Sequence, residues 1–138
     1  MSYTTKIKNE ISKIENTKSE SIAELSAFIR NNGYIENNCL YLTTENESIL
    51  NRLTKFIISL YDVKVELEEK NNLNFSKKKL NVIIIKDKVN HILQDVGYYS
   101  KDNIYLDYPP NYIVGANEEI RAYLRGVFLC QGSINDPE

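Results

Sequence analysis

The sequence is poor in the residues that build metal and redox sites, and it has no stretch that could span a membrane. Among 138 residues there are two cysteines, Cys39 and Cys130, without CxxC spacing, and one histidine, His91. One histidine cannot build a His-rich metal site, and two isolated cysteines are typical of reduced, buried thiols. No apolar run approaches the roughly 20 residues of a membrane span, and the polar start lacks a signal peptide's apolar core. We therefore expect a cytoplasmic protein with no membrane partner.

A surplus of basic residues is also missing. Seventeen Lys and Arg against nineteen Asp and Glu give a net charge of −2, which excludes a strongly basic nucleic-acid binder but not a locally basic one. No glycine-rich phosphate loop, GxSxG turn or HExxH helix occurs, so we expect no enzyme and no cofactor. With 42% hydrophobic and 26% charged residues, the chain is typical of a single soluble globular domain.

Hydrophobic periodicity predicts where helices and strands lie along the sequence. Apolar residues at helical spacing predict helices over roughly 4–15, 21–33, 44–60, 87–97 and 117–132. Helix starts are indicated by the capping-box pairs Ser21/Glu24 and Thr44/Glu47 and by Asp87 and Asn117. Strands are expected around Tyr34 and at 39–43, 63–68 and 80–85. Because the strands come in adjacent pairs between helices, we predict an α+β fold with an antiparallel sheet, helices packed on one face and a preceding N-terminal helix.

Two of the predicted helices are similar to each other. An offset of 99 residues places Gly33 over Gly132 and aligns small residues that lie four apart on both helices. Such a ridge lets two helix backbones approach closely. A glycine inside a helix costs about 1 kcal/mol relative to alanine, and close packing would compensate; the alternative is an ordinary core helix with a stray glycine. The predicted helix-pair interface comprises Ala23, Ala27, Gly33, Ala122, Gly126 and Gly132.

These helices also carry a family resemblance. The segments LSAFIRNNG (Leu25–Gly33) and LRGVFLCQG (Leu124–Gly132) resemble the two signature helices of the LAGLIDADG homing-endonuclease fold. The ending AYLRGVFLCQGSINDPE (Ala122–Glu138) is similar to the hallmark segment of the bacterial WhiA family, as are the opening MSYTTKIKNEIS and the stretch AELSAFIRNNG. The resemblance implies an N-terminal helix at 1–16, a first LAGLIDADG-like repeat at 17–97, a Tyr/Pro linker at 98–116 and the signature helix of an incomplete second repeat at 117–138.

The function implied by this resemblance is that of a nucleoid-associated, DNA-binding transcriptional regulator of cell division, chromosome segregation and, in some relatives, sporulation. In that family a C-terminal helix-turn-helix domain, absent from this sequence, would make the main DNA contacts, so we expect the chain to be part of a longer protein. Two roles are open for the domain that this sequence encodes. Either it contributes weak DNA contacts, or it is a protein-interaction and dimerisation module.

A homing-endonuclease activity is a remote third alternative. Nucleases of this fold place an acidic residue next to last in each signature helix, where two carboxylates hold catalytic metal ions. The matching positions here are Asn32 and Gln131, whose neutral amides bring no negative charge to a hard cation. Asp136 lies nearby in sequence, and the only acidic residue that could match it after Gly33 is Glu36, so a displaced metal pair is a remote alternative. We therefore expect no metal site and no catalytic residue.

Basic residues that could contact DNA are few. On the third strand Lys64 alternates with Glu66 and Glu68, a mixed to acidic face that repels phosphate. The nearest basic cluster is Lys77–Lys79, which is either a solvated loop or a phosphate clamp. Five tyrosines of the linker are expected to pack it back on the domain: Tyr98, Tyr99, Tyr105, Tyr108 and Tyr112.

Dimerisation is predicted from the incomplete second repeat. The helix at 117–132 has an apolar stripe that includes Leu124 and Phe128 and requires a partner. If this helix pairs with the helix at 21–33 of its own chain, a neighbouring apolar surface stays uncovered. We therefore expect a homodimer.

Overall fold

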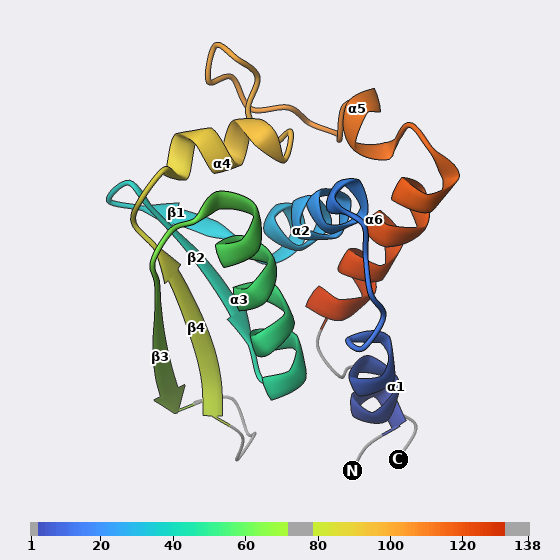
Figure 1. Ribbon diagram of the computed structural model, residues 1–138. Coiled ribbons are helices and arrows are strands. Elements are labelled where there is room, and N and C mark those ends of the chain that lie inside the picture. The colour runs from blue at the N-terminus through green and yellow to red at the C-terminus, as the bar shows by residue number, and fades with distance from the viewer. Residues whose placement is uncertain (1–2, 72–78, 132–138) are drawn as a thin grey trace.

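The structure, a computed structural model, describes residues 3–71 and 79–131. A four-stranded antiparallel sheet of order β1-β2-β4-β3 carries helices on one face (Figure 1). This confirms the predicted α+β fold with its N-terminal helix. In chain order the elements are α1 (Tyr3–Ile11), α2 (Lys18–Asn32), β1 (Tyr34–Glu36), β2 (Cys39–Thr44), α3 (Glu47–Tyr61), β3 (Val65–Asn71), β4 (Lys79–Ile85), α4 (Val89–Asp95), α5 (Asn111–Val114) and α6 (Asn117–Cys130).

The start of α2 differs from the prediction. The capping box is formed by Thr17 and Glu20, because the Thr17 hydroxyl accepts from the Glu20 amide at 3.3 Å and Glu20 accepts from the Thr17 amide at 2.8 Å. The prediction of a box at Ser21 and Glu24 is wrong, since both lie inside the helix and are buried. The Glu24 side chain therefore does not cap the helix and can interact with other residues.

The N-cap residues of three further helices also differ from the predicted ones. The side chain of Asn46, rather than Thr44, caps α3 by accepting from the Ile49 amide at 3.1 Å. Lys88, not Asp87, occupies the N-cap position of α4 in a left-handed conformation, with φ of 57°. At α6 the N-cap position is Ala116, whose amide donates to the Glu119 carboxylate at 2.9 Å. Each N-cap position lies within two residues of its predicted position, which is the usual uncertainty of helix ends.

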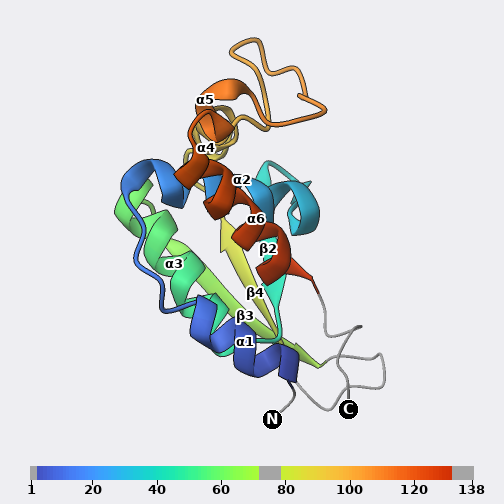
Figure 2. The ribbon, with the colours of Figure 1, turned by 90° about the vertical axis from the view of Figure 1, so that its right-hand side faces the viewer.

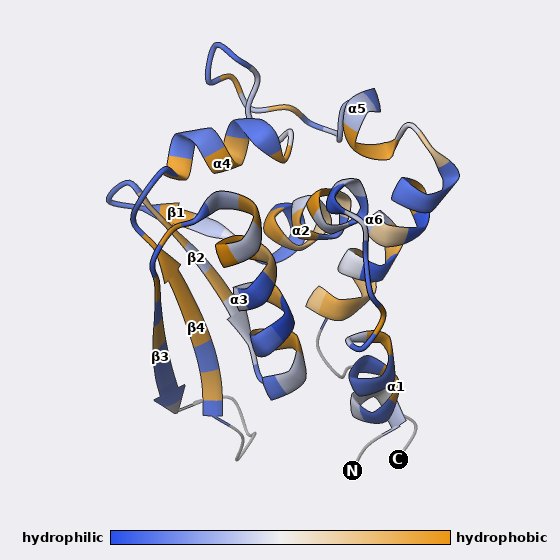
Figure 3. Cartoon of the chain, in the orientation of Figure 1, coloured by the Kyte–Doolittle hydropathy of each residue, from blue (hydrophilic) through white to orange (hydrophobic). Residues whose placement is uncertain are grey.

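The core lies between the sheet and the helices α2 and α3. On the two central strands, Leu40 pairs with Ile85 and Leu42 with Ile83, and all four side chains are buried. Figure 3 shows the contrast between the apolar end of β4 and the hydrophilic edge strand β3. Because β3 has a neighbour on one side only, its Leu67 is 53% exposed although it alternates with charged residues as a core position would. The core is therefore built on β2 and β4.

Residues 98–116 are more ordered than a linker without periodicity suggests. They contain the short helix α5, which starts directly after Pro110, where a fixed φ near −70° suits a helix start. Arg30 of α2 donates to the carbonyls of Leu106 at 2.6 Å and Gly97 at 2.7 Å. Next to this anchor the ring of Tyr98 packs against the rings of Tyr99 and Tyr105. Tyr98 and Tyr99 pack against the core as expected, whereas Tyr105, Tyr108 and Tyr112 are exposed.

The cysteines and the histidine occupy ordinary positions. Cys39 and Cys130 are free thiols that are half-buried rather than buried, and burial raises the pKa of Cys130. His91 is exposed and places its ring edge-on to Tyr61 at 6.0 Å between centroids. These positions give no sign of metal or redox chemistry.

We expect Tyr61→Phe to destabilise the fold by about 1–3 kcal/mol at neutral pH, because it leaves Asp95 without its hydrogen bond. The buried Tyr61 hydroxyl donates to the Asp95 carboxylate at 2.6 Å, and burial together with this bond raises the pKa of Tyr61. The wild-type advantage is complete below pH 10 and declines above it, because there the unfolded state loses the proton that the folded state keeps. Urea unfolding of both proteins between pH 7 and 11 measures this, and a constant difference across that range would contradict it.

Candidate functional site

The helices α2 and α6 lie side by side in the middle of the molecule (Figures 1 and 2). A Cβ atom placed on Gly126 of α6 would lie 2.3 Å from the Glu24 carbonyl oxygen and 2.8 Å from the Ala27 Cβ. Both distances are shorter than van der Waals contact, so only glycine fits between the two backbones. Among the other predicted interface residues, Ala23, Ala27 and Ala122 are fully buried.

The two terminal glycines of the predicted interface are placed differently. A Cβ on Gly33 would meet its own helix at Ile29 and the strand β2 at Leu42, and no α6 atom is among its nearest neighbours. Gly33 therefore ends α2 against the sheet, because the chain turns there into β1. Gly132 lies outside the described residues, as does Asp136.

A buried ionic cluster sits on the helix pair. The Glu24 carboxylate is fully buried and accepts from Arg52 Nε at 2.6 Å and Arg52 Nη2 at 2.9 Å. It also accepts from Arg125 Nε at 3.3 Å and from the Asn16 amide at 3.1 Å. One carboxylate thus joins α2, α3, α6 and the segment before α2. We call Glu24, Arg52, Arg125 and Asn16 the Glu24 cluster.

The cluster also fixes the chain between α1 and α2. Arg52 Nη1 donates to the carbonyls of Ser12 at 2.8 Å and Ile14 at 2.5 Å, and Arg125 Nη2 donates to Asn16 Oδ1 at 2.6 Å. The cluster could not be predicted from local spacing, because its arginines lie 28 and 101 residues from Glu24. A glutamate on the buried side of α2 was the available signal, since such a residue is rarely buried without partners.

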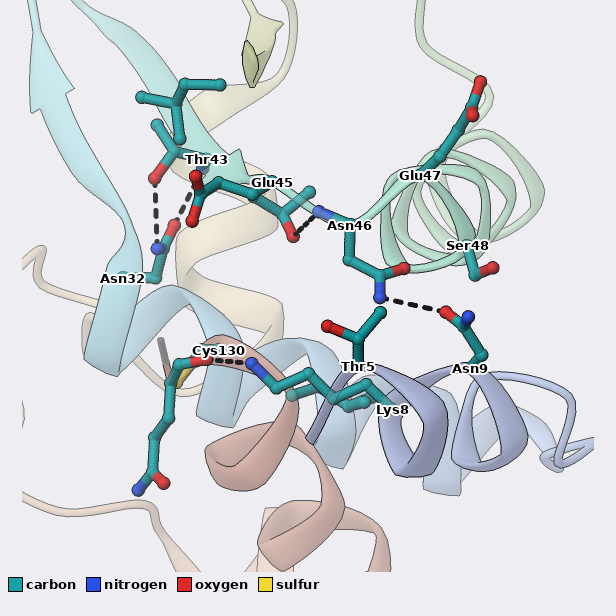
Figure 4. Close-up of a pocket in the computed structure, with 14 residues that line it drawn as sticks. Thr5, Lys8, Asn9, Asn32, Thr43, Glu45, Asn46, Glu47, Ser48 and Cys130 are labelled. Atoms are coloured by element: carbon teal, nitrogen blue, oxygen red, sulfur yellow. Dashed lines mark hydrogen bonds between the residues drawn. The ribbon is translucent and has the colours of Figure 1, made fainter. Parts of the chain in front are cut away.

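At the base of the helix pair, a pocket of about 540 Å³ is lined by α1, the end of α2, β2, the start of α3 and the end of α6 (Figure 4). Asn32, the first of the two degenerate nuclease positions, has its amide directed to β2. Its Oδ1 accepts from the Thr43 amide at 2.8 Å and its Nδ2 donates to the Thr43 hydroxyl at 3.1 Å. The side chain therefore connects α2 to the sheet.

A lysine from the N-terminal helix reaches the second degenerate position. Lys8 of α1 is 7% exposed, and its ammonium donates to the backbone carbonyl of Gln131, directly after α6. A cation at a helix C-terminus is favourable because it offsets the partial negative charge of the last carbonyls. Glu45 and Glu47 line the same pocket from the start of α3. In residues 3–71 and 79–131 no three His, Cys, Asp or Glu side chains gather as a metal ion would require.

The predicted DNA contacts do not form one basic surface in the described part of the chain. Lys64 is exposed directly before β3, and Lys79 begins β4, where it pairs with Glu69 at 3.3 Å. Lys77 and Lys78 lie outside the described residues. On the sheet face away from the helices, Lys86 pairs with Glu66 at 2.9 Å, and the rings of Tyr34 and Tyr41 stack at 4.8 Å.

This antiparallel sheet, with helices on one face and two helices in backbone contact, defines a LAGLIDADG-like domain. Two solved structures share the fold with a TM-score of 0.64 each. The N-terminal LAGLIDADG domain of WhiA is 19% identical, and full-length WhiA from Thermatoga maritima is 16% identical. The alignments cover 93% and 94% of this chain, and 57% and 39% of those chains.

Sequence comparison identifies the family. The model of the WhiA N-terminal LAGLIDADG-like domain matches residues 18–99, so the chain belongs to the WhiA family. It is 32% identical to the probable cell division protein WhiA of Pediococcus pentosaceus and 34% identical to that of Staphylococcus epidermidis. Both alignments include the whole chain, which spans only about half of these relatives, 46% and 45%. None of the helices in the described ranges has the length and apolar character needed to cross a membrane.

Proposed function

We propose that this chain is a non-catalytic scaffold domain of a DNA-binding transcriptional regulator that acts in cell division and associates with the nucleoid. Roles in chromosome segregation and, in some relatives, sporulation belong to the same proposal, with a helix-turn-helix domain elsewhere in the protein making the main DNA contacts. Support comes from the relatives, which are named as cell division proteins. The base of the helix pair carries the argument against nuclease chemistry.

That base is organised to hold the fold together. A metal-dependent nuclease needs carboxylates there to bind its ions. The Asn32 amide is engaged by Thr43, and the Lys8 ammonium lies at the end of α6. A fixed ammonium at this place repels a divalent cation. We therefore propose that Lys8 and Asn32 replace a metal centre by structural contacts.

The sheet surface supports scaffolding more than DNA contact. Affinity for duplex DNA comes mainly from lysines and arginines that neutralise phosphates. On the face away from the helices, Lys86, directly after β4, is already paired with Glu66. Glu68, two residues further along β3, is exposed on the same face. Phosphates approaching this face therefore meet carboxylates as well as ammonium groups.

A salt titration on duplex DNA tests the scaffold role. We expect no detectable binding by fluorescence anisotropy at low salt in the range of about 1–100 µM protein, where non-specific DNA binders saturate. We also expect no cleavage of plasmid DNA with Mg²⁺ or Mn²⁺. Micromolar binding that falls steeply with salt and is weakened by Lys64→Glu would instead establish a direct DNA role. Cleavage that depends on either metal would overturn the non-catalytic proposal.

A dimerisation role is favoured by one further observation. On α6, Leu124 is 60% exposed and Ile120 is 41% exposed, while Ala122 and Gly126 of the same helix are buried against α2. We propose that this exposed side of α6 pairs with a second copy of the chain.

Light scattering after size exclusion measures the association. We expect a dimer whose dissociation constant rises about tenfold or more in Leu124→Asp, because the change buries a charge at the interface. The matched control is Ile104→Asp in the exposed loop before α5, where the parent side chain is 63% exposed. A monomer at every concentration tested would contradict this role.

A further inference from the structure

A second hollow lies away from the base of the helix pair. It is a groove of about 880 Å³ between the connection from α1 to α2 and one side of α3. Figures 1 and 2 both show this connection running alongside α3. On α3 the lining residues recur every three to four positions, so they form one continuous helix face. They are Ser48, Asn51, Arg52, Lys55, Phe56, Ser59 and Leu60.

The floor of the groove is partly apolar. Phe56 and Leu60 are half-buried, and Ile14 faces them from the connection with 42% of its surface exposed. Arg52 lies 4.8 Å from the centre of the Phe56 ring. Since Arg52 also binds Ser12, Ile14 and Glu24, the two walls of the groove are fixed relative to each other before any partner arrives.

The rim of the groove is positively charged. Lys13, Lys18 and Lys55 are exposed around it, while Glu15 is the single acidic residue among the described residues that line it. Lys13 pairs with Glu10 at 3.8 Å, whereas within residues 3–71 and 79–131 no salt bridge uses Lys18 or Lys55. This local excess of positive charge contrasts with the net charge of −2 of the whole chain.

We propose that this groove is a docking site for an acidic amphipathic segment of another protein. Apolar side chains of such a segment, recurring at helical spacing, would contact Ile14, Phe56 and Leu60, and its carboxylates would face the three lysines. A nucleic-acid backbone fits the lysines but gains nothing from the apolar floor, which therefore favours a protein partner. The site goes beyond the scaffold role proposed above, because it shares only Ser48 with the pocket at the base of the helix pair.

The probe is a fluorescein-labelled peptide of about 18 residues, with leucine at i, i+3, i+4 and i+7 and glutamate at the remaining positions. Its partner probe has lysine in place of every glutamate. We expect the acidic peptide to bind the full chain and the basic peptide to bind at least tenfold more weakly. Binding should shift the backbone amide NMR signals of Ile14, Phe56 and their neighbours.

Matched variants locate the binding. Lys18→Glu with Lys55→Glu should weaken acidic-peptide binding at least tenfold, whereas Lys6→Glu with Lys101→Glu, at exposed sites elsewhere, gives the same net charge and should leave it within about twofold. Ile14→Ser should also weaken it, because it removes apolar floor without changing charge. The proposal is overturned if the acidic peptide does not bind, or if both double variants weaken its binding equally. It is also overturned if a duplex DNA probe shifts the same amide signals while the acidic peptide does not.

Discussion

Replacing Glu24 with glutamine is expected to destabilise the domain by about 3–5 kcal/mol, because it leaves two arginines without their buried counter-charge. Glutamine has the same shape as glutamate, so the loss of stability measures the effect of removing the charge alone. Arg52 is nearly as buried as Glu24, with side-chain exposures of 6% and 1%, and it cannot recover its hydration without opening the structure. For a domain of this size the change corresponds to a fall in Tm of roughly 10–20 °C.

The control for this experiment is Glu118→Gln, which removes the same charge from an exposed position at the start of α6. We expect it to stay within about 0.5 kcal/mol of wild type. Thermal unfolding followed by circular dichroism measures both variants. If Glu24→Gln were as mild as the control, the Glu24 cluster would not be what joins α2, α3 and α6.

The second large effect is expected at Gly126. On an exposed helix surface, changing glycine to alanine stabilises by about 1 kcal/mol through helix propensity. At Gly126 we expect the opposite sign, a loss of about 1–3 kcal/mol, because the new methyl group would lie 2.3 Å from the Glu24 carbonyl oxygen. A backbone atom cannot move aside as the end of a flexible side chain can. Gly126→Leu should be worse still.

Two comparisons make this result specific to the helix contact. Ser59→Ala, at an exposed position of α3, should leave stability unchanged or slightly raised by helix propensity. Combining Ala27→Gly with Gly126→Ala should cost less than the sum of the two single variants, because it removes the contact with the Ala27 Cβ, the second nearest atom at 2.8 Å. A stabilised Gly126→Ala single variant would show that α2 and α6 lie farther apart than the structure has them.

Local patterns in the sequence account for most of the fold. Alternation and helical spacing located the four strands of the described sheet and the five longer helices, because most of these elements bury an apolar face that leaves a period in the sequence. Element ends were less predictable, since Thr17 and Ser21 could both cap α2, Thr44 and Asn46 could both cap α3, and composition alone does not select between them. The four-residue helix α5 is too short to show a period at all.

The candidate site was predictable only where its residues follow one another on a helix. Ala27 and Gly126 were predicted as interface residues because small residues recur on both helices, and the structure brings them into contact. The roles of Glu24 and Lys8 were not predictable, because their partners are distant in sequence and a charged residue on an amphipathic helix normally faces water. A long-range charge pair leaves no period to detect.

The spacing of the arginines around Glu24 has a consequence for the order of events during synthesis. Arg52 follows Glu24 after 28 residues, but Arg125 follows only after 101, and the contact between Lys8 and Gln131 spans 123. A nascent chain emerging from the ribosome can therefore join α2 to α3 long before α6 exists. Contacts of such wide separation form slowly because the intervening loop must close first. Pairing of α2 with α6 therefore comes after pairing of α2 with α3, and until α6 has been synthesised the alanine face of α2 stays uncovered.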